Sequence, residues 1–274
     1  MSQHSDDRDG TLVVASDNPR LKRLRRLQQS KRDRQNEGVF LVEGDRFAIE
    51  ALVEGQAPQC VYVDADAPES LLAELRAASD ARGVPMVRIG HRVFVTLSML
   101  STPGNVLVEM GMPPLVTDDS KNLVIALDGV QDPGNLGTIL RSAAAVDGVS
   151  LRLSSDCVDP FGSKVVRASA RLVETVGIAR PLDLGASLRQ DVEEGRQVVI
   201  FAAGEGPSLW ELSIAPNAVL VFGSEGRGVS DEVGGSTRER CHLPLSEKAE
   251  SLNVGVTVSI AIFEILRRRI SHEP

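Results

Sequence analysis

The chain has 274 residues, a length that allows one large domain or two moderate ones. Hydrophobic residues make up 42% and charged residues 25%, which permits a buried core, and no apolar run approaches the roughly 20 residues of a membrane-spanning helix. The net charge of −8 is unevenly distributed, because residues 20–34 hold eight Lys or Arg and one Asp. Such a stretch can bind phosphates locally, and a solvated helix face is the ordinary alternative.

The N-terminus, the cysteines and the histidines indicate the kind of compartment in which the protein works and whether it contains disulfides or a metal site. Residues 1–10 are polar and acidic, which fits neither a signal peptide nor a transit peptide, so we expect a disordered tail and a cytoplasmic protein. Cys60, Cys157 and Cys241 are odd in number and far apart, which argues against a disulfide framework. The four histidines are scattered without zinc-site spacing, so we expect no metal.

The first part of the chain predicts a small three-layer α/β domain over residues 11–110. Residues 16–18 before Pro19 are a helix-start signal, and Leu21, Leu24 and Leu27 give the following basic helix one apolar stripe. Strands and helices then alternate. We predict strands at 39–44, 60–65 and 85–90, and helices through 46–55 and 70–83.

A change of composition marks a boundary near 111–121. Prolines and an Asp-Asp-Ser cluster over 100–122 are typical of turns and linkers. The second α/β series then occupies 122–274, and its strands are apolar throughout, as in a parallel sheet covered on both faces. We predict strands at 123–129, 150–155, 173–178, 197–204 and 218–223, a short strand ending at Pro244, and helices near 135–146, 163–171, 185–194 and 251–269.

Three segments of the second series each follow a predicted strand, where ligands of parallel sheets bind. The first, 127–143, is a glycine-containing loop that opens a helix carrying Arg141; it fits neither a phosphate-binding P-loop nor a dinucleotide fingerprint. The second, 218–230, is a glycine-rich turn around Glu225. The third, 241–269, places Ser251 and Asn253 at the start of an apolar helix, where each taken singly is a helix cap.

Together and in this order, the segments resemble the SpoU/TrmH family of ribose 2′-O-methyltransferases within the SPOUT superfamily. The resemblance covers about residues 122–270. Residues 40–52 are similar to the substrate-binding domain that precedes the catalytic domain in many members, and 102–109 look like its end. Two positions depart from the usual pattern, Ser224 and Gly255. The family motifs read Asn135, Gly137 and Arg141, then Gly223, Ser224, Glu225 and Gly226, then Pro244 and Ser251, Leu252, Asn253 and Val254.

The resemblance implies an α/β fold whose parallel-sheet domain contains a C-terminal trefoil knot, and a homodimer whose active site forms across the subunit interface. It implies S-adenosyl-L-methionine (SAM) as cofactor, held mainly by backbone in the knotted loops. The implied cofactor-binding positions are Ala203, Gly204, Gly223, Leu243 and Leu252.

Methyl transfer to a ribose requires an aligned 2′-oxygen and loss of its proton. The resemblance assigns the proton or the alkoxide to Arg141. Because a guanidinium is effectively never deprotonated, we favour an electrostatic role over proton acceptance. Asn135 and Glu225 are expected to fix Arg141 and the ribose, with Ser251 and Asn253 completing the site.

The expected substrate is RNA, bound through phosphates and recognised by its shape, because one Trp, one Tyr and seven Phe offer few stacking platforms. The added N-terminal domain favours 23S ribosomal RNA, for housekeeping or for antibiotic resistance, over transfer RNA. A non-catalytic RNA-binding protein is the alternative from another class, and a nucleotide-dependent oxidoreductase is a more distant one. The candidate phosphate-binding residues are Arg20, Lys22, Arg23, Arg25 and Arg26.

Overall fold

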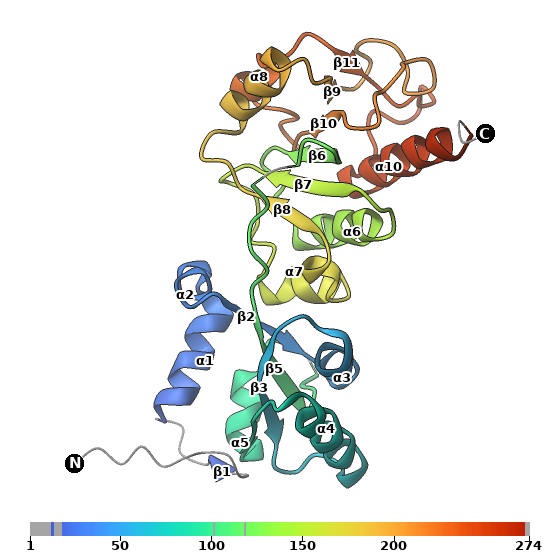
Figure 1. Cartoon of the computed structure of the whole chain (residues 1–274). Coiled ribbons are helices and arrows are strands. Elements are labelled where there is room, and N and C mark those ends of the chain that lie inside the picture. Colours follow the sequence, from blue (N-terminus) through green and yellow to red (C-terminus); the bar gives the residue numbers. More distant parts are fainter. Residues whose placement is uncertain (1–11, 14–17, 101, 118, 272–274) are drawn as a thin grey trace. The chain divides into compact units, whose positions relative to one another are not determined.

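The computed structural model describes residues 12–13, 18–100, 102–117 and 119–271 (Figure 1). The predicted tail at 1–10 and the first two residues of the helix-start signal lie outside these ranges. The chain divides into two compact units. The first unit comprises Met1–Pro113 and Phe161–Glu174, and the second comprises Pro114–Pro160 and Thr175–Pro274.

The first unit contains a five-stranded sheet in the order β1-β4-β3-β5-β2. Its strands are β1 (Leu12–Val13), β2 (Val39–Glu43), β3 (Pro58–Asp64), β4 (Met86–Ile89) and β5 (Val106–Gly111). Its helices are α1 (Pro19–Gln29), α2 (Lys31–Glu37), α3 (Asp45–Glu54), α4 (Glu69–Arg82), α5 (His91–Phe94), η1 (Val95–Leu97), α7 (Ser163–Ala168) and η2 (Leu172–Glu174).

The basic helix forms as its sequence predicts. The Asn18 side chain caps α1 by accepting a hydrogen bond from the Arg20 N–H, and Pro19 supplies the first helical residue. Leu21, Leu24 and Leu27 are fully buried against the sheet core. Because this apolar stripe faces the core, the basic residues of α1 lie on the other faces of the helix.

One interior strand of the first sheet, β5, has no counterpart among the predicted strands. β5 is antiparallel and lies between β3 and β2, two strands that the alternating pattern would place in a simpler parallel arrangement. The turn residues on both sides of 106–111 predict a linker when only the neighbouring sequence is considered. Five of the six β5 residues are nonetheless buried, because the strand is paired on both edges.

The segment 161–174 also differs from the prediction, which assigned it to the second domain. The Phe161 ring packs against Phe40 of β2 at a centroid separation of 5.3 Å, and α7 lies against the same strand. The helix ends at Ala168 rather than near 171. Ala170 and Arg171 have φ angles of 50° and 68°, a left-handed conformation that cannot continue a helix.

The second unit contains a six-stranded, entirely parallel sheet in the order β11-β9-β10-β6-β7-β8. This confirms the predicted parallel α/β class. Its strands are β6 (Leu123–Leu127), β7 (Val149–Leu153), β8 (Gly177–Ala179), β9 (Val198–Phe201), β10 (Val219–Phe222) and β11 (Arg240–Cys241). Its helices are α6 (Pro133–Ala144), α8 (Leu184–Glu193), α9 (Asp231–Gly234) and α10 (Val254–Ser271).

The predicted linker is shorter than 111–121 in the structure. The chain passes from one unit to the other after Pro113, and the following residues are already packed. The Val116 N–H donates to the Ile178 carbonyl at 2.9 Å, and Asp119 is 9% exposed with bonds to Arg152 and Arg196. None of the helices in the described part of the chain is long and apolar enough to cross a membrane.

Candidate active site

The three motif segments of the second unit follow β6, β10 and β11, strands of the same parallel sheet. β10 pairs with β6 on one side, with Phe222 opposite Leu127, and with β9 on the other side. The loops after β6 and β10 are tied together, because the Asp128 carboxylate accepts a hydrogen bond of 2.7 Å from the Ser230 N–H. This topology delivers the predicted segments to one edge of the sheet.

Asn135, Glu225 and Asn253 form a closed set of hydrogen bonds, which we call the polar triangle. The Asn135 side-chain N–H donates to the Glu225 carboxylate at 2.9 Å. The Asn253 side-chain N–H group donates to both others, at 2.7 Å to the Asn135 amide oxygen and 2.7 Å to the Glu225 carboxylate. One residue of the triangle thus comes from each motif, although 118 positions separate the most distant pair.

Asn253 is both a helix cap and a member of this site. Its amide oxygen accepts a 3.2 Å bond from the Val256 N–H at the start of α10, while its amide N–H group faces Asn135 and Glu225. The helix begins at Val254, later than predicted. Asn253 can therefore cap α10 and take part in the site at the same time, because its amide oxygen and its amide N–H group bind different partners.

Two glycines of the turn after β10, Gly223 and Gly228, are explained by backbone crowding and by backbone conformation, respectively. A Cβ atom on Gly223 would lie 2.0 Å from the Gly228 carbonyl carbon. Ser224 and Gly228 exchange both backbone hydrogen bonds, at 3.0 and 2.9 Å, and Gly228 has a φ of 65°. This closed turn holds Glu225 at its tip. Gly255 has a related role, since a Cβ there would lie 3.1 Å from the Thr138 side chain of α6.

A largely apolar pocket lies beside the polar triangle, and we call it the motif pocket. Four of the five predicted cofactor positions, Ala203, Gly223, Leu243 and Leu252, line it, together with Glu225 and Ser251. Gly204 follows Ala203 with a φ of 71° and does not line it. Pocket residues that the sequence analysis missed include Phe201 and Phe222, whose rings stack at 4.3 Å, and also His242, Leu245 and Thr257.

A second, more polar hollow adjoins the motif pocket. Both are lined by Ser224, Glu225 and Val254, and the second is also lined by Asn135 and Arg227. Ser251 is exposed and makes no hydrogen bond with any described residue. Glu225 of the polar triangle therefore lies where the two hollows adjoin.

Arg141 lies apart from the polar triangle within one chain. It is exposed near the end of α6, six residues after Asn135, which places it roughly 9 Å farther along the helix and about 120° around it. Arg141 makes no hydrogen bond or ion pair with a described residue. The expected contacts of Asn135 and Glu225 with Arg141 are not formed within the chain, because both side chains bond to Asn253 instead.

The basic helix does not present all its cations equally. Arg23 forms a two-pronged ion pair with the buried Glu109 carboxylate at 2.6 and 2.7 Å and also bonds to Glu37. These hydrogen bonds raise the pKa of Arg23. Arg26 lies 3.8 Å from Glu37, and Arg25 donates to the Thr96 hydroxyl. Arg23 therefore stabilises the first unit, since its donors are already occupied by carboxylates.

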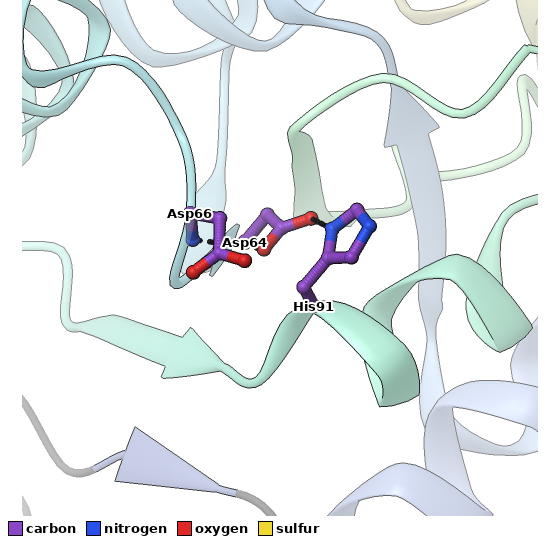
Figure 2. A group of neighbouring side chains, drawn as sticks. All are labelled: Asp64, Asp66 and His91. Atoms are coloured by element: carbon purple, nitrogen blue, oxygen red, sulfur yellow. Dashed lines mark hydrogen bonds and ion pairs between the residues drawn. The ribbon is translucent and has the colours of Figure 1, made fainter.

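One group in the first unit has a geometry that could suit a cation (Figure 2). Ligand atoms of Asp64, Asp66 and His91 lie within 4.8 Å of one another. The His91 Nδ1 is 2.6 Å from the Asp64 carboxylate, and the Asp66 backbone N–H donates to the same carboxylate at 3.0 Å. The bond to Asp64 raises the pKa of His91. These bonds account for the arrangement as an ion pair at a strand end.

Both units match known families. Residues 122–263 match the SpoU rRNA Methylase family, and residues 18–108 match the MRM3-like substrate binding domain. A Synechocystis protein described as an uncharacterized tRNA/rRNA methyltransferase is 30% identical over 94% of both chains. The 23S rRNA (guanosine(2553)-2′-O)-methyltransferase RlmP of Bacillus subtilis is 27% identical over 92% of this chain and 98% of its own.

Solved structures agree with these matches. A putative TrmH-family RNA methyltransferase from Porphyromonas gingivalis has a TM-score of 0.76 and 32% identity, covering 90% of this chain and 96% of its own. An AdoMet-bound rRNA methyltransferase from Sinorhizobium meliloti has a TM-score of 0.75 and 27% identity, covering 94% and 98%. With its three motifs gathered at one sheet edge, the chain belongs to the SpoU rRNA methylase family of RNA methyltransferases.

Proposed function

We propose that this protein transfers a methyl group from SAM to a ribose 2′-hydroxyl of RNA, with 23S ribosomal RNA as the substrate. The observation that carries the proposal is the polar triangle of Asn135, Glu225 and Asn253 beside the motif pocket. An exposed, hydrogen-bonded carboxylate and two amides are suited to orienting a sugar, and the adjoining apolar pocket suits an adenosine group.

The motif pocket fits SAM by its chemistry. Its walls include Leu243, Leu245 and Leu252 and the stacked pair Phe201 and Phe222, which suit an apolar ring system. The turn at Gly223 brings main chain close to the pocket, where N–H and carbonyl groups can bind a ligand without a charged side chain. The AdoMet-bound relative from Sinorhizobium meliloti supports this choice of cofactor. When bound, SAM supplies a methyl group on a positively charged sulfur.

The chain's own residues would act on the acceptor ribose by position and charge. Glu225 and Asn135 line the polar hollow next to the motif pocket, where they can orient the sugar hydroxyls. Stabilising the developing 2′-oxyanion requires a fixed cation, and Arg141 has five donors with no partner among the described residues. Because Arg141 lies away from the triangle of its own chain, we propose that it serves the triangle of a second subunit.

A surface on α10 supports the homodimer that this arrangement needs. Val256, Phe263 and Ile270 are 43%, 47% and 62% exposed. They recur every seven residues on α10, so they form one apolar stripe on its outer face. α10 packs against α6, the helix that carries Arg141, with the Ser142 and Ser259 hydroxyls 2.7 Å apart. A stripe contacting its copy would bring the Arg141 helix near the interface.

The choice of 23S ribosomal RNA rests on the relative RlmP and on the substrate-binding domain match over 18–108. The trefoil knot also belongs to the proposal; the six-stranded parallel sheet and the closed turns at its edge are compatible with it.

Titration calorimetry with SAM and methyl transfer to ribosomal and transfer RNA from a deletion strain test the activity. We expect heat of SAM binding and one new 2′-O-methyl in 23S RNA. Methylation confined to transfer RNA would overturn the substrate assignment, and absence of SAM binding would overturn the enzyme assignment. Arg141→Lys is expected to lower turnover by about 10²-fold or more, since an ammonium cannot reproduce the guanidinium fork.

Mixing two inactive variants tests the shared site. Arg141→Ala and Asn253→Asp chains, combined as random dimers, should recover about a quarter of the wild-type activity, because half of the dimers are mixed and each has one intact composite site. If Arg141 instead serves its own chain, every site in a mixed dimer is damaged and no activity returns.

A further inference from the structure

A pocket in the first unit, separate from the active site, has no part in the proposed chemistry. It lies between β2, α3 and α7 and has a volume of about 400 Å³, within the size range of small-ligand sites. Its apolar lining comes from Val42, Phe47, Met99, Leu100 and Val166. We call it the α7 pocket.

The walls of the α7 pocket are held in place without a ligand. The Glu43 carboxylate accepts hydrogen bonds from the Ser98 hydroxyl and, at 3.0 Å, from the Met99 N–H, which fixes the segment that follows η1. On the opposite side, the contact between Phe161 and Phe40 holds the start of the α7 segment against β2. A preformed pocket avoids the entropy cost of ordering its walls when a ligand binds.

Two unneutralised cations stand at this pocket. Lys164 and Arg167 of α7 line it, are exposed, and make no hydrogen bond or ion pair with a described residue. The third cation, Arg171, is buried and already paired with Glu174 and Glu54. The pocket therefore combines an apolar, aromatic lining with two available positive charges. This combination complements a nucleotide, which has a flat apolar base and an anionic phosphate.

We propose that the α7 pocket binds one unpaired nucleotide of the RNA substrate, with its base against Phe47 and its phosphates on Lys164 and Arg167. The inference rests on the proposed function and adds to it, because it requires a single-stranded or flipped-out nucleotide in the recognised RNA. The proposal also modifies the expectation that the RNA is selected by its shape alone. Aromatic residues are few in this chain, but the Phe47 ring is partly exposed and lines a pocket large enough for one nucleotide.

Fluorescence anisotropy with the full-length protein tests this site, using a labelled oligouridylate and a blunt RNA duplex as probes. Phe47→Ala is expected to weaken oligouridylate binding roughly 5- to 100-fold, the usual loss for one stacked base, and to leave duplex binding within about twofold. Lys164→Gln with Arg167→Gln should lower the slope of log affinity against log salt by up to about 1.4 for the oligouridylate, because each lost single-strand phosphate contact contributes about 0.7.

The matched control is Arg76→Gln with Arg92→Gln, which removes two exposed cations of the same unit that do not line the pocket. We expect its salt slope for the oligouridylate to equal that of the wild type. Equal losses in the control and pocket variants would overturn the inference, as would unchanged oligouridylate binding by Phe47→Ala. SAM binding and methylation by the wild type report on the proposed function separately, so an active enzyme with neutral pocket variants would refute this site alone.

Discussion

Two polar clusters of the second unit differ in how far they are exposed to solvent. Asp119, Arg152, Asp191 and Arg196 form a buried cluster in which each side chain is only 8–9% exposed. The polar triangle of Asn135, Glu225 and Asn253 is open to solvent on Glu225 and Asn253.

The buried cluster is saturated with partners. Arg196 donates to both aspartates and to the carbonyls of Asn122 and Asn217, and Arg152 donates to both aspartates and to the Ser187 hydroxyl. The two guanidinium charges of this cluster balance its two carboxylate charges. In the triangle, one oxygen of the Glu225 carboxylate accepts hydrogen bonds from both amides, and Glu225 lines both hollows. A saturated buried cluster stabilises a fold, whereas an exposed cluster with spare hydrogen-bonding capacity is available to a ligand.

The largest expected effect is on the buried cluster. Arg152→Met leaves the Asp119 and Asp191 carboxylates with one guanidinium between them, so we expect the free energy of unfolding to fall by about 3–5 kcal/mol. Urea denaturation measures this change. The control Arg46→Met removes a cation that is 85% exposed and should not measurably change stability. A loss below about 1 kcal/mol would mean that Arg196 and solvent are enough to stabilise these carboxylates without Arg152.

Asn253→Asp should separate capping from catalysis. The new carboxylate still accepts the Val256 N–H bond, but it loses the donors to Asn135 and Glu225 and adds a negative charge beside Glu225. We expect turnover to fall by about 10²-fold, with a stability change below about 1 kcal/mol. Kinetics and denaturation of the same sample measure both. Near-normal turnover would reduce Asn253 to a helix cap. Asn253→Ala, in contrast, should lose both functions.

Phe263→Glu tests whether the stripe on α10 holds two copies together. Placing a charge in an apolar contact should raise the dimer dissociation constant at least tenfold, on the order of 1.4 kcal/mol. Sedimentation equilibrium measures the constant. Val53→Glu alters an apolar residue of α3 that is 61% exposed in the first unit, and it should leave the constant unchanged. A wild-type protein that sediments as a monomer would remove the basis for a shared Arg141.

The smallest expected effect concerns His91. Its pKa is raised by Asp64, so its stabilising contribution is fully present below its unfolded pKa of about 6.5 and fades as the pH rises through the folded value. An NMR titration of the imidazole should give a midpoint above about 6.5, and Asp64→Asn should lower it towards the ordinary value. An unshifted midpoint in the wild type would show that the pair in Figure 2 does not persist in solution.

Much of the fold was predictable because local patterns agree with it. The leucine stripe of α1, the glycine that ends α4 and the apolar strands of the parallel sheet all lie where periodicity and turn chemistry predict. β5 was missed because its flanking turn residues suggest a linker, whereas pairing on both edges makes it a strand. Pairing with distant strands leaves no local signal.

The candidate site shows the same division. Three motifs in order along the chain identify Asn135, Glu225 and Asn253 as site residues. That these side chains contact one another depends on the strand order of the folded sheet. The pairing of Arg23 with Glu109, across 86 positions, could not be inferred from the charge of the helix. A run of cations indicates charge but not which of its members a distant carboxylate already holds.

The sequence alone determined the family, the parallel class of the second sheet and the residue types of the site, because these depend on spacing along the chain. The tertiary structure alone decided which polar groups are saturated and which are open: it buried Asp119 with two arginines, occupied Arg23 and left Arg141, Lys164 and Arg167 without partners among the described residues. The physical reason is that hydrogen bonds and ion pairs act over a few ångströms of space, whatever the distance along the chain.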